Sequence, residues 1–161
     1  MELTQELVKK LFEYKEEGLY WKIKPSTRVQ SGDRFGHIGV KGYRKGTIKN
    51  KTYTEHRLIF LYHHGYLPKL VDHVNGNKSD NRIENLREAS WKQNLRNSKR
   101  SKRNTSGHKG VSWIASRKRW QVTIMTDYSN SFKGYFKDFE LACLVADEVR
   151  DLYHKEFARH G

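Results

Sequence analysis

The stretch that decides the fold reads VDHVNGNKSDNRIENLREASWKQN and spans residues 71–94. It opens on an apolar residue and an Asp-His pair, passes through a turn around a Gly-Asn step, and ends in a predicted helix that contains Asn94. Hydrolysis of a phosphodiester needs a base that deprotonates water and a cation that neutralises the charge building on the phosphate. His73 suits the first task, because an imidazole titrates near neutral pH. Asp72 and Asn94 suit the second, because Mg²⁺ prefers hard oxygen ligands.

This segment resembles the HNH nuclease motif in the form carried by phage and intron homing endonucleases. That family's pattern reads Asp-His-hydrophobe-Asn/Asp-Gly, then Asn-Arg-hydrophobe-x-Asn-Leu-Arg, then a later Asn. The chain matches every stage, at residues 72–76, at residues 81–87 and at Asn94. The resemblance implies an α+β fold with a ββα-metal finger, in which His73 ends the first strand and Asn94 lies on the helix.

The resemblance also implies a role for each matching residue. His73 would be the general base, and Asn85 would brace the loop and orient the His73 ring. Asp72 and Asn94 would hold one divalent cation, expected to be Mg²⁺ with Mn²⁺ as the alternative. The final residue of the motif is Asn94 here, where other HNH proteins carry His.

Two further groups of polar residues lie just before the motif and within it. For His56-Arg57-Leu58 two interpretations stay open, a contact of Arg57 with the phosphate near the cut and a structural role for His56 in holding its helix to the finger. The other group is predicted to build the turn by bonding to its own backbone rather than to bind metal. It comprises Asn75, Asn77, Asp80 and Asn81.

The residues before the motif predict a helix followed by hairpins and a second helix. Leu3, Leu7, Val8 and Leu11 recur at helical spacing behind Thr4, so a helix is expected over about the first fourteen residues. Residues 18–53 carry glycines between short β-prone pieces, which is typical of hairpins. Residues 54–64 return to a helical pattern that ends at a glycine.

Charge defines the expected partner. The 161 residues include 32 Lys or Arg against 18 acidic residues, a net charge of +14, which favours a polyanion such as double-stranded DNA. A membrane surface is the competing partner, but no apolar run is long enough to span a bilayer and no signal-like segment begins the chain, so a cytoplasmic protein is expected. The one cysteine, Cys143, excludes an internal disulfide framework and zinc sites built from paired cysteines.

The most basic part of the chain follows the motif. Between Ala89 and Thr126 there are ten Lys or Arg residues and no Asp or Glu. Residues 97–106 are predicted to form a basic linker between two modules, and phosphate contacts are expected there. The predicted contacts in this part of the chain are Arg96, Lys99, Arg100, Lys102 and Arg103.

The carboxy-terminal part predicts a three-stranded antiparallel sheet packed on one helix. Three short β-prone runs precede a helix capped by Asp138, with Leu141, Val145, Val149, Leu152 and Tyr153 expected on its buried face. This part resembles the Apetala/ethylene-response-factor type of DNA-binding domain at residues 106–111, 119–124, 133–136 and 156–158. The resemblance implies a sheet laid into the major groove.

Alternation along the second strand assigns its faces. Trp120, Val122 and Ile124 are expected to face the helix. For Trp113 two interpretations stay open, stacking at the edge of the DNA and packing under the sheet, and packing is favoured because large aromatic surfaces are most often buried. Because Ser112 and Met125 stand where the plant proteins carry arginine, no base preference is transferred, and an outward face that holds phosphates without selecting sequence stays open. The residues expected to face DNA are Lys109, Ser112, Arg117, Arg119, Gln121 and Thr123.

The sequence therefore predicts a metal-dependent DNA endonuclease of homing type that nicks or cuts double-stranded DNA at a preferred site. The predicted parts are an HNH nuclease domain at residues 1–96, the linker at 97–106 and the DNA-binding domain at 107–161. The alternative is a non-catalytic, sequence-specific DNA-binding regulator, and an RNA-binding protein is a third possibility. A phage or mobile-element origin follows from the resemblance alone, and the oligomeric state stays open, with a monomer favoured.

Overall fold

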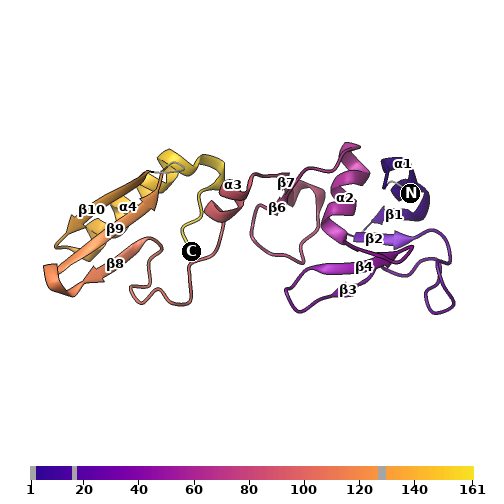
Figure 1. Cartoon of the computed structure of the whole chain (residues 1–161), viewed down its shortest axis with the longest axis horizontal. Helices are drawn as coiled ribbons and strands as arrows, with labels where there is room; N and C mark the ends of the chain where they lie inside the picture. The colour runs from indigo at the N-terminus through magenta and orange to yellow at the C-terminus, as the bar shows by residue number, and fades with distance from the viewer. Residues whose placement is uncertain (1–2, 16–17, 127–129) are drawn as a thin grey trace. The chain divides into compact units, whose positions relative to one another are not determined.

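The computed structural model describes residues 3–15, 18–126 and 130–161 (Figure 1). The chain divides into two compact units, one ending at Ser90 and the other beginning at Trp91. Helix α3 (Trp91–Arg96) groups with the second unit because it packs against the short 3₁₀ turn η3 (Lys155–Phe157). The linker predicted at residues 97–106 therefore lies inside the second unit, and the boundaries of the functional domains stay a prediction.

The first unit begins with α1 (Gln5–Leu11), which packs on the rest of its unit through Val8 and Leu11. The hydroxyl of Thr4 accepts a 3.2 Å hydrogen bond from the Leu7 amide and caps the helix, as the pattern predicted. The helix is shorter than predicted, because the backbone becomes extended at Phe12 and continues as β1 (Phe12–Lys15). Strand β1 pairs antiparallel with β2 (Gly18–Trp21).

Next comes a three-stranded antiparallel sheet of β3 (His37–Ile38), β4 (Arg44–Ile48) and β5 (Lys51–Thr54), with β4 in the middle. Lys49 and Asn50 turn the β4–β5 hairpin with φ angles of 45° and 65°, the backbone that suits a two-residue hairpin loop. Helix α2 (Glu55–His64) follows and ends at Gly65, whose φ is 79°. The predicted hairpins and second helix are confirmed.

The core of the first unit is built around the inner face of α2. Fully buried side chains from five segments meet there: Val8, Phe12, Leu19, Phe35, Leu58 and Ile59. Glu55, in the first turn of α2, is also fully buried, although a carboxylate is costly to bury without partners. Its partners lead to the candidate site described below.

The motif region forms a hairpin-like pair of short strands. Strand β6 (Val71–His73) pairs antiparallel with β7 (Leu86–Glu88), and the 3₁₀ turn η1 (Ile83–Asn85) leads into β7. The register places Asp72 opposite Arg87. His73 ends its strand and Asn94 lies on α3, both as predicted, while the complete ββα-metal arrangement stays a proposal.

The second unit contains a sheet of β8 (Val111–Ile114), β9 (Arg119–Met125) and β10 (Ser131–Phe136), all antiparallel with β9 in the middle. The 3₁₀ turn η2 (Ala115–Arg117) joins β8 to β9. Helix α4 (Phe139–His154) packs across the sheet (Figure 1), and the Asp138 carboxylate accepts a 2.7 Å hydrogen bond from the Leu141 amide. The predicted sheet, helix and cap are confirmed.

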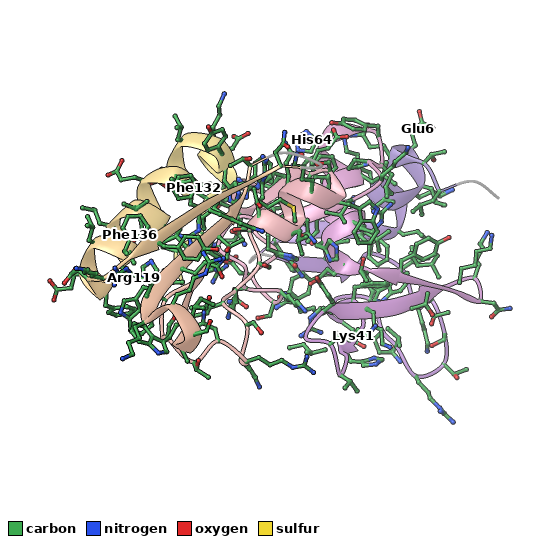
Figure 2. All side chains as sticks on the ribbon, turned by 60° about the vertical axis from the view of Figure 1, so that its left-hand side comes forward. Glu6, Lys41, His64, Arg119, Phe132 and Phe136 are labelled. Atoms are coloured by element: carbon green, nitrogen blue, oxygen red, sulfur yellow. The ribbon has the colours of Figure 1, made fainter. Side chains whose placement is uncertain are left out.

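The core of the second unit confirms one facing prediction and corrects another. Val122 and Ile124 of β9 are buried against α4. The ring centres of Trp120 and Phe139 lie 4.5 Å apart. Phe132 and Phe136 of β10 pack against the same core (Figure 2). The predicted buried face of α4 is wrong for Leu141, Leu152 and Tyr153, which are exposed, and right for Val149, which packs partly buried against the core. Ala142, Ala146 and Arg150 of α4 are buried. Small alanine side chains let the helix approach the sheet closely.

Trp113 is only partly packed. Its ring lies 5.1 Å from that of Trp120, its cross-strand partner, yet 47% of its surface is exposed. Across the described ranges, no helix has the length and apolarity needed to cross a membrane.

Candidate active site

His73 lies at the end of β6 and is 3% exposed. Its ring nitrogen Nε2 lies 2.9 Å from the side-chain oxygen Oδ1 of Asn81. The centre of the His56 ring lies 5.0 Å from the centre of the His73 ring, and the centre of the Tyr43 ring lies 6.0 Å from it. Burial lowers the pKa of His73 below its usual value, although the bond to Asn81 and the charge of Asp72 oppose this effect. A neutral, proton-accepting imidazole is therefore favoured at neutral pH.

Asn81 links His73 to Glu55, the buried carboxylate of α2. The Asn81 amide nitrogen Nδ2 donates a 2.6 Å hydrogen bond to Oε2 of Glu55, and Asn81 is 1% exposed. Oε1 of the same carboxylate accepts a 3.1 Å bond from the Leu19 amide. Arg34 and Arg44 approach Oε2 at 3.4 and 3.7 Å and balance its charge.

This chain of bonds selects one tautomer of the His73 ring. An ionised carboxylate only accepts hydrogen bonds, so Glu55 aligns the NH₂ group of Asn81 toward itself and leaves the amide oxygen facing His73. That oxygen also only accepts, so Nε2 of His73 carries the proton. The lone pair of the neutral ring then lies on Nδ1.

His56 lies beside this ring in a buried environment. It is 7% exposed, and its Nδ1 atom is buried without a hydrogen-bond partner. Burial, together with the nearby His73 and Arg57, lowers the pKa of His56 to about 3. His56 is therefore a neutral part of the wall around His73, which supports the structural interpretation of this residue. Arg57 is half-buried and donates a 3.1 Å bond to the carbonyl of Lys69.

Asp72 lies beside His73 in the chain and is held by Arg87. Nε and Nη2 of Arg87 each lie 3.1 Å from Oδ2 of Asp72, and the carboxylate is largely buried. Burial and the charge of Asp72 together raise the pKa of Tyr43. The Asp72 carboxylate is thus fixed in orientation and contributes negative charge to the surroundings of His73.

The loop between His73 and β7 is braced by Asn85, as the resemblance implied. Oδ1 of Asn85 accepts a 3.0 Å bond from the Asn75 amide, and its Nδ2 donates to Oδ1 of Asn75 and to the Asp80 carbonyl at 3.1 and 2.8 Å. These bonds hold the loop, and the His73 ring itself is held by Asn81.

The turn prediction is confirmed for three of its four residues. Side-chain oxygens of Asn75, Asn77 and Asp80 accept bonds from backbone amides two residues further on, at 2.8, 3.2 and 3.4 Å. For Asn81 it is wrong, because its amide is buried between His73 and Glu55 and needs both of those partners. The short sequence distance from the turn concealed this long-range role.

Tyr43 and Lys78 also lie near His73, and sequence reasoning missed both. Nζ of Lys78 lies 4.7 Å from the centre of the Tyr43 ring and donates a 3.2 Å bond to the Lys41 carbonyl. The positive charge of Lys78 is close enough to lower the pKa of His73. Lys78 is an exposed turn residue of the motif, and only its charge offered a signal.

The metal site predicted from the motif is divided between the two units. Asp72 belongs to the first and Asn94, on α3, to the second, so their joint role stays a prediction. In the described part of the chain, no group of three or more His, Cys, Asp and Glu residues is placed to hold a metal ion. Asp72 has the right donor chemistry, since a fixed, buried carboxylate oxygen is a hard ligand.

The residues predicted to bind DNA differ in their surroundings. Lys109 is held by three bonds, since its Nζ donates to the carbonyls of Arg96, Ser98 and Arg159 at 2.9, 2.6 and 3.0 Å. Arg96 donates to the Thr126 carbonyl. The others are exposed or half-exposed: Lys99, Arg100, Lys102, Arg103, Ser112, Arg117, Arg119, Gln121 and Thr123.

Comparison with known proteins identifies a family for this chain. Residues 53–96 match the family model described as HNH endonuclease, a range that includes Glu55, His73, Asn81 and Asn94. Over 99 residues the chain is 36% identical to Protein 3.8 of Escherichia phage T7, a match that covers 59% of this chain and 79% of the phage protein. No solved structure matches. The chain therefore belongs to the family of phage T7 Protein 3.8 and contains an HNH endonuclease domain at residues 53–96.

Proposed function

We propose that this protein is a metal-dependent DNA endonuclease of homing type, with His73 as its general base. The observation that carries the proposal is the buried chain of hydrogen bonds from Glu55 through Asn81 to Nε2 of His73. A structural histidine needs only a satisfied hydrogen bond. Here a buried carboxylate, neutralised by two arginines, orients an amide that in turn orients the ring. Such support is expected where one ring nitrogen must face a substrate.

In the proposed reaction, Nδ1 of His73 takes a proton from a water molecule as that water attacks the scissile phosphorus. The bond from phosphorus to the leaving oxygen breaks, and the leaving oxygen takes a proton from solvent. Asp72 and Asn94 would hold one Mg²⁺ or Mn²⁺, and that ion would supply charge stabilisation at the phosphate when bound. Lys78 adds positive charge near His73, and Arg57 is the proposed contact to the adjacent phosphate.

The second unit is proposed to supply affinity for double-stranded DNA. Its sheet presents Thr123 and Met125 of β9 on the side opposite α4, and the segment from Lys99 to Arg103 is exposed and basic. Phosphate contacts by such residues position a protein on DNA without reading its sequence. The likeness to the Apetala/ethylene-response-factor type of domain remains part of this proposal, as does a phage or mobile-element origin.

Relaxation of supercoiled plasmid tests the proposed function. The full chain with Mg²⁺ is expected to yield nicked circles, and added chelator is expected to stop the reaction. His73→Ala removes the proposed base and is expected to lower the nicking rate by at least about a hundredfold. His64→Ala is the matched control, because His64 lies in the last turn of α2 and is exposed.

The alternative function, a DNA-binding regulator, predicts a different result in the same assay. Wild type and His73→Ala would bind DNA equally well, and both would leave the plasmid supercoiled with Mg²⁺, Mn²⁺ and other divalent ions. That outcome would reject the nuclease proposal.

A further inference from the structure

An open hollow of about 520 Å³ lies in the second unit beside the exposed ring of Trp113. The residues that line it are Thr105, Ser106, Trp113, Trp120 and Lys137. Two of these five described residues are tryptophans, one is a lysine and none is acidic. An aromatic ring next to a cation is the combination with which proteins hold an unpaired nucleotide, because the base stacks on the ring and the phosphate meets the charge.

Trp113 lies on the side of the sheet that α4 covers. It pairs across the strands with Trp120, and directly opposed residues of an antiparallel pair point to the same face. Trp120 in turn packs on Phe139, the first residue of α4. The hollow is therefore separate from the opposite face of the sheet, which presents Thr123 and Met125 and is the proposed duplex surface.

The walls of the hollow are held in place before any ligand arrives. The ring centres of Trp113 and Trp120 lie 5.1 Å apart in an edge-to-face arrangement, and Phe139 fixes Trp120 from α4. Ser106 belongs to the loop before β8 and donates a 2.7 Å bond from its hydroxyl to the Val111 carbonyl. Yet Trp113 keeps 47% of its surface exposed. A ring that is already fixed loses little conformational entropy when a ligand stacks on it.

The charge around the hollow suits an anionic ligand. Lys137 is exposed, and the carboxylate of the neighbouring Asp138 is engaged in capping α4 through the Leu141 amide. The exposed segment of residues 99–103, with four Lys or Arg residues, ends two positions before Thr105. A strand of nucleic acid that enters the hollow therefore finds further cations along the chain next to it.

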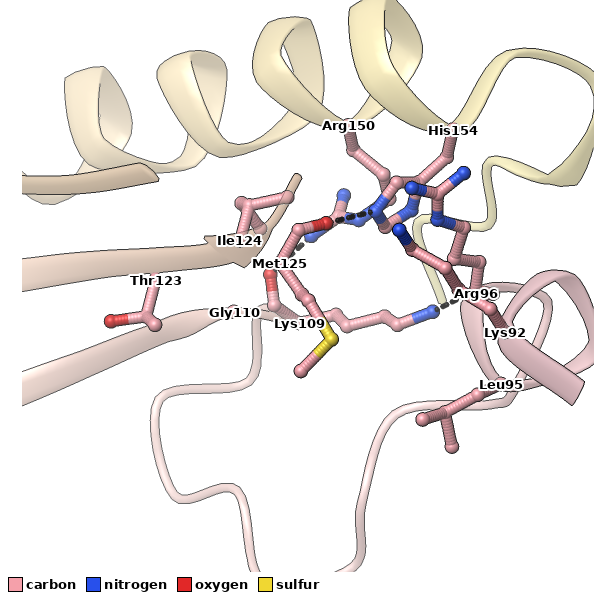
Figure 3. A pocket seen from close by; sticks show the side chains of 10 residues that line it. All are labelled: Lys92, Leu95, Arg96, Lys109, Gly110, Thr123, Ile124, Met125, Arg150 and His154. Carbon is pink, nitrogen blue, oxygen red and sulfur yellow. Dashed lines mark hydrogen bonds between the residues drawn. The ribbon is translucent and has the colours of Figure 1, made fainter. Parts of the chain in front are cut away.

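A second hollow of this unit, of about 180 Å³ between α3, β9 and α4, is less suited to a nucleotide (Figure 3). Two of its cations already have acceptors, since Lys109 donates to three backbone carbonyls and Arg150 donates to Asp147 at 2.7 Å. Among the described residues that line it there is no Trp, Tyr or Phe, so it offers no broad ring for stacking. The hollow beside Trp113 provides both the ring and the charge.

We propose that the hollow beside Trp113 binds one nucleotide of single-stranded DNA, with the base stacked on Trp113 and a phosphate at Lys137. Every base has a flat face, so this binding is tolerant of sequence. In a closed duplex the bases already stack on one another and leave no face free for Trp113. The activity goes beyond the proposed cleavage of duplex DNA and does not involve His73.

Fluorescence anisotropy of labelled oligo(dT) with the full chain, in the presence of chelator, tests the proposal. Trp113→Ala is expected to weaken oligo(dT) binding by about fivefold to a hundredfold, the range for the loss of one stacked base. Trp113→Phe keeps an aromatic ring and is expected to retain most of the affinity. Tyr153→Ala is the matched control, because Tyr153 is 46% exposed and lies on α4 outside the lining of the hollow. Equal affinities of wild type and Trp113→Ala would overturn the proposal.

The phosphate contact has its own readout. In Lys137→Gln, the slope of log K against log salt concentration for oligo(dT) is expected to fall by about 0.7, the value for one phosphate of a single strand. Lys10→Gln makes the same chemical change at an exposed site on α1 and is expected to leave the slope unchanged. A wild-type slope in Lys137→Gln would overturn the phosphate contact.

Photocrosslinking of the wild-type protein decides the question even if Trp113→Ala fails to fold. An oligonucleotide of 5-bromodeoxyuridine is expected to crosslink to Trp113 on irradiation, and mass spectrometry of the peptides locates the crosslink. Crosslinks confined to other residues would overturn the proposal, and tighter binding of oligo(rU) than of oligo(dT) would reject DNA as the occupant. Neither result affects plasmid nicking, and failure of the nuclease proposal leaves oligo(dT) binding intact.

Discussion

Asn81 donates a 2.6 Å hydrogen bond to Glu55, a carboxylate that lies 26 residues earlier in the chain and is fully buried. The bond connects the first turn of α2 to the loop that follows His73. It fixes which end of the Asn81 amide faces the His73 ring, and through that the position of the ring's proton. The acid–base behaviour of His73 thus depends on a residue that lies outside the Asp-His pair.

Asn81→Ala is expected to lower the single-turnover nicking rate by about tenfold to a hundredfold while changing DNA affinity little. The ring would lose the acceptor that holds the proton on Nε2, so both tautomers would be populated. ¹⁵N NMR of the His73 ring reports the tautomer directly. Asn77→Ala removes an exposed turn amide from the same loop and serves as the control. A wild-type rate and tautomer in Asn81→Ala would contradict the positioning role of Asn81.

Arg87→Leu is expected to destabilise the first unit by about 3 kcal/mol, because it leaves the Asp72 carboxylate buried without its arginine. Urea unfolding of the full chain measures the free energy. Asp72→Asn in the same background is expected to recover part of the loss, since it removes the buried charge. The losses in free energy of unfolding of the two single variants can be added and compared with the loss in the double variant. If the two values were equal, the pairing of Asp72 with Arg87 would contribute nothing to stability.

His56 makes the fold sensitive to acid. Its pKa is about 3 in the folded protein and near 6.5 when exposed, so below pH 6.5 the unfolded chain binds more protons than the native state. Stability from this residue is complete above pH 6.5 and is lost as the pH falls, by about 1.4 kcal/mol per pH unit until about pH 3. Urea unfolding of wild type and His56→Gln between pH 4 and 7 isolates this contribution. Parallel pH profiles for the two proteins would show that His56 is not buried as a neutral ring.

Arg119→Gln is expected to weaken DNA binding. The loss of affinity should be the same for duplexes of unrelated sequence. If Arg119 contacts one phosphate, the slope of log K against log salt concentration falls by about 0.9. Fluorescence anisotropy across a salt series measures that slope. Glu148→Gln, on the exposed side of α4, is the control for altered charge. An unchanged slope in Arg119→Gln would remove Arg119 from the proposed DNA surface.

Local patterns predicted most of the fold. Helix α2 ends at a glycine with positive φ, and α4 begins at a capping aspartate, because these signals act over a few residues. Part of the buried face of α4 was predicted wrongly, for a tertiary reason. The helix carries two candidate apolar stripes, and the close approach to the sheet favours the one with alanines over the one with Leu141 and Leu152.

The motif predicted His73, but the residues that support its ring were harder to find. Glu55 opens α2, where an acidic residue is also favourable to the helix dipole, so its sequence position gives no sign of burial. Asn81 sits among turn-forming residues and looks like one of them. Their roles follow from contacts between segments far apart in the chain, which the sequence pattern alone does not encode.

Rescue of His73→Ala by imidazole tests the central claim most directly. The substitution leaves a space where the ring of His73 stood, and imidazole in solution can occupy it and take the proton from water. We predict that His73→Ala with Mg²⁺ leaves plasmid supercoiled, that added imidazole restores nicking in a concentration-dependent way, and that chelator abolishes the restored activity. Nicking by His73→Ala at the wild-type rate without imidazole would contradict the assignment of His73 as the base.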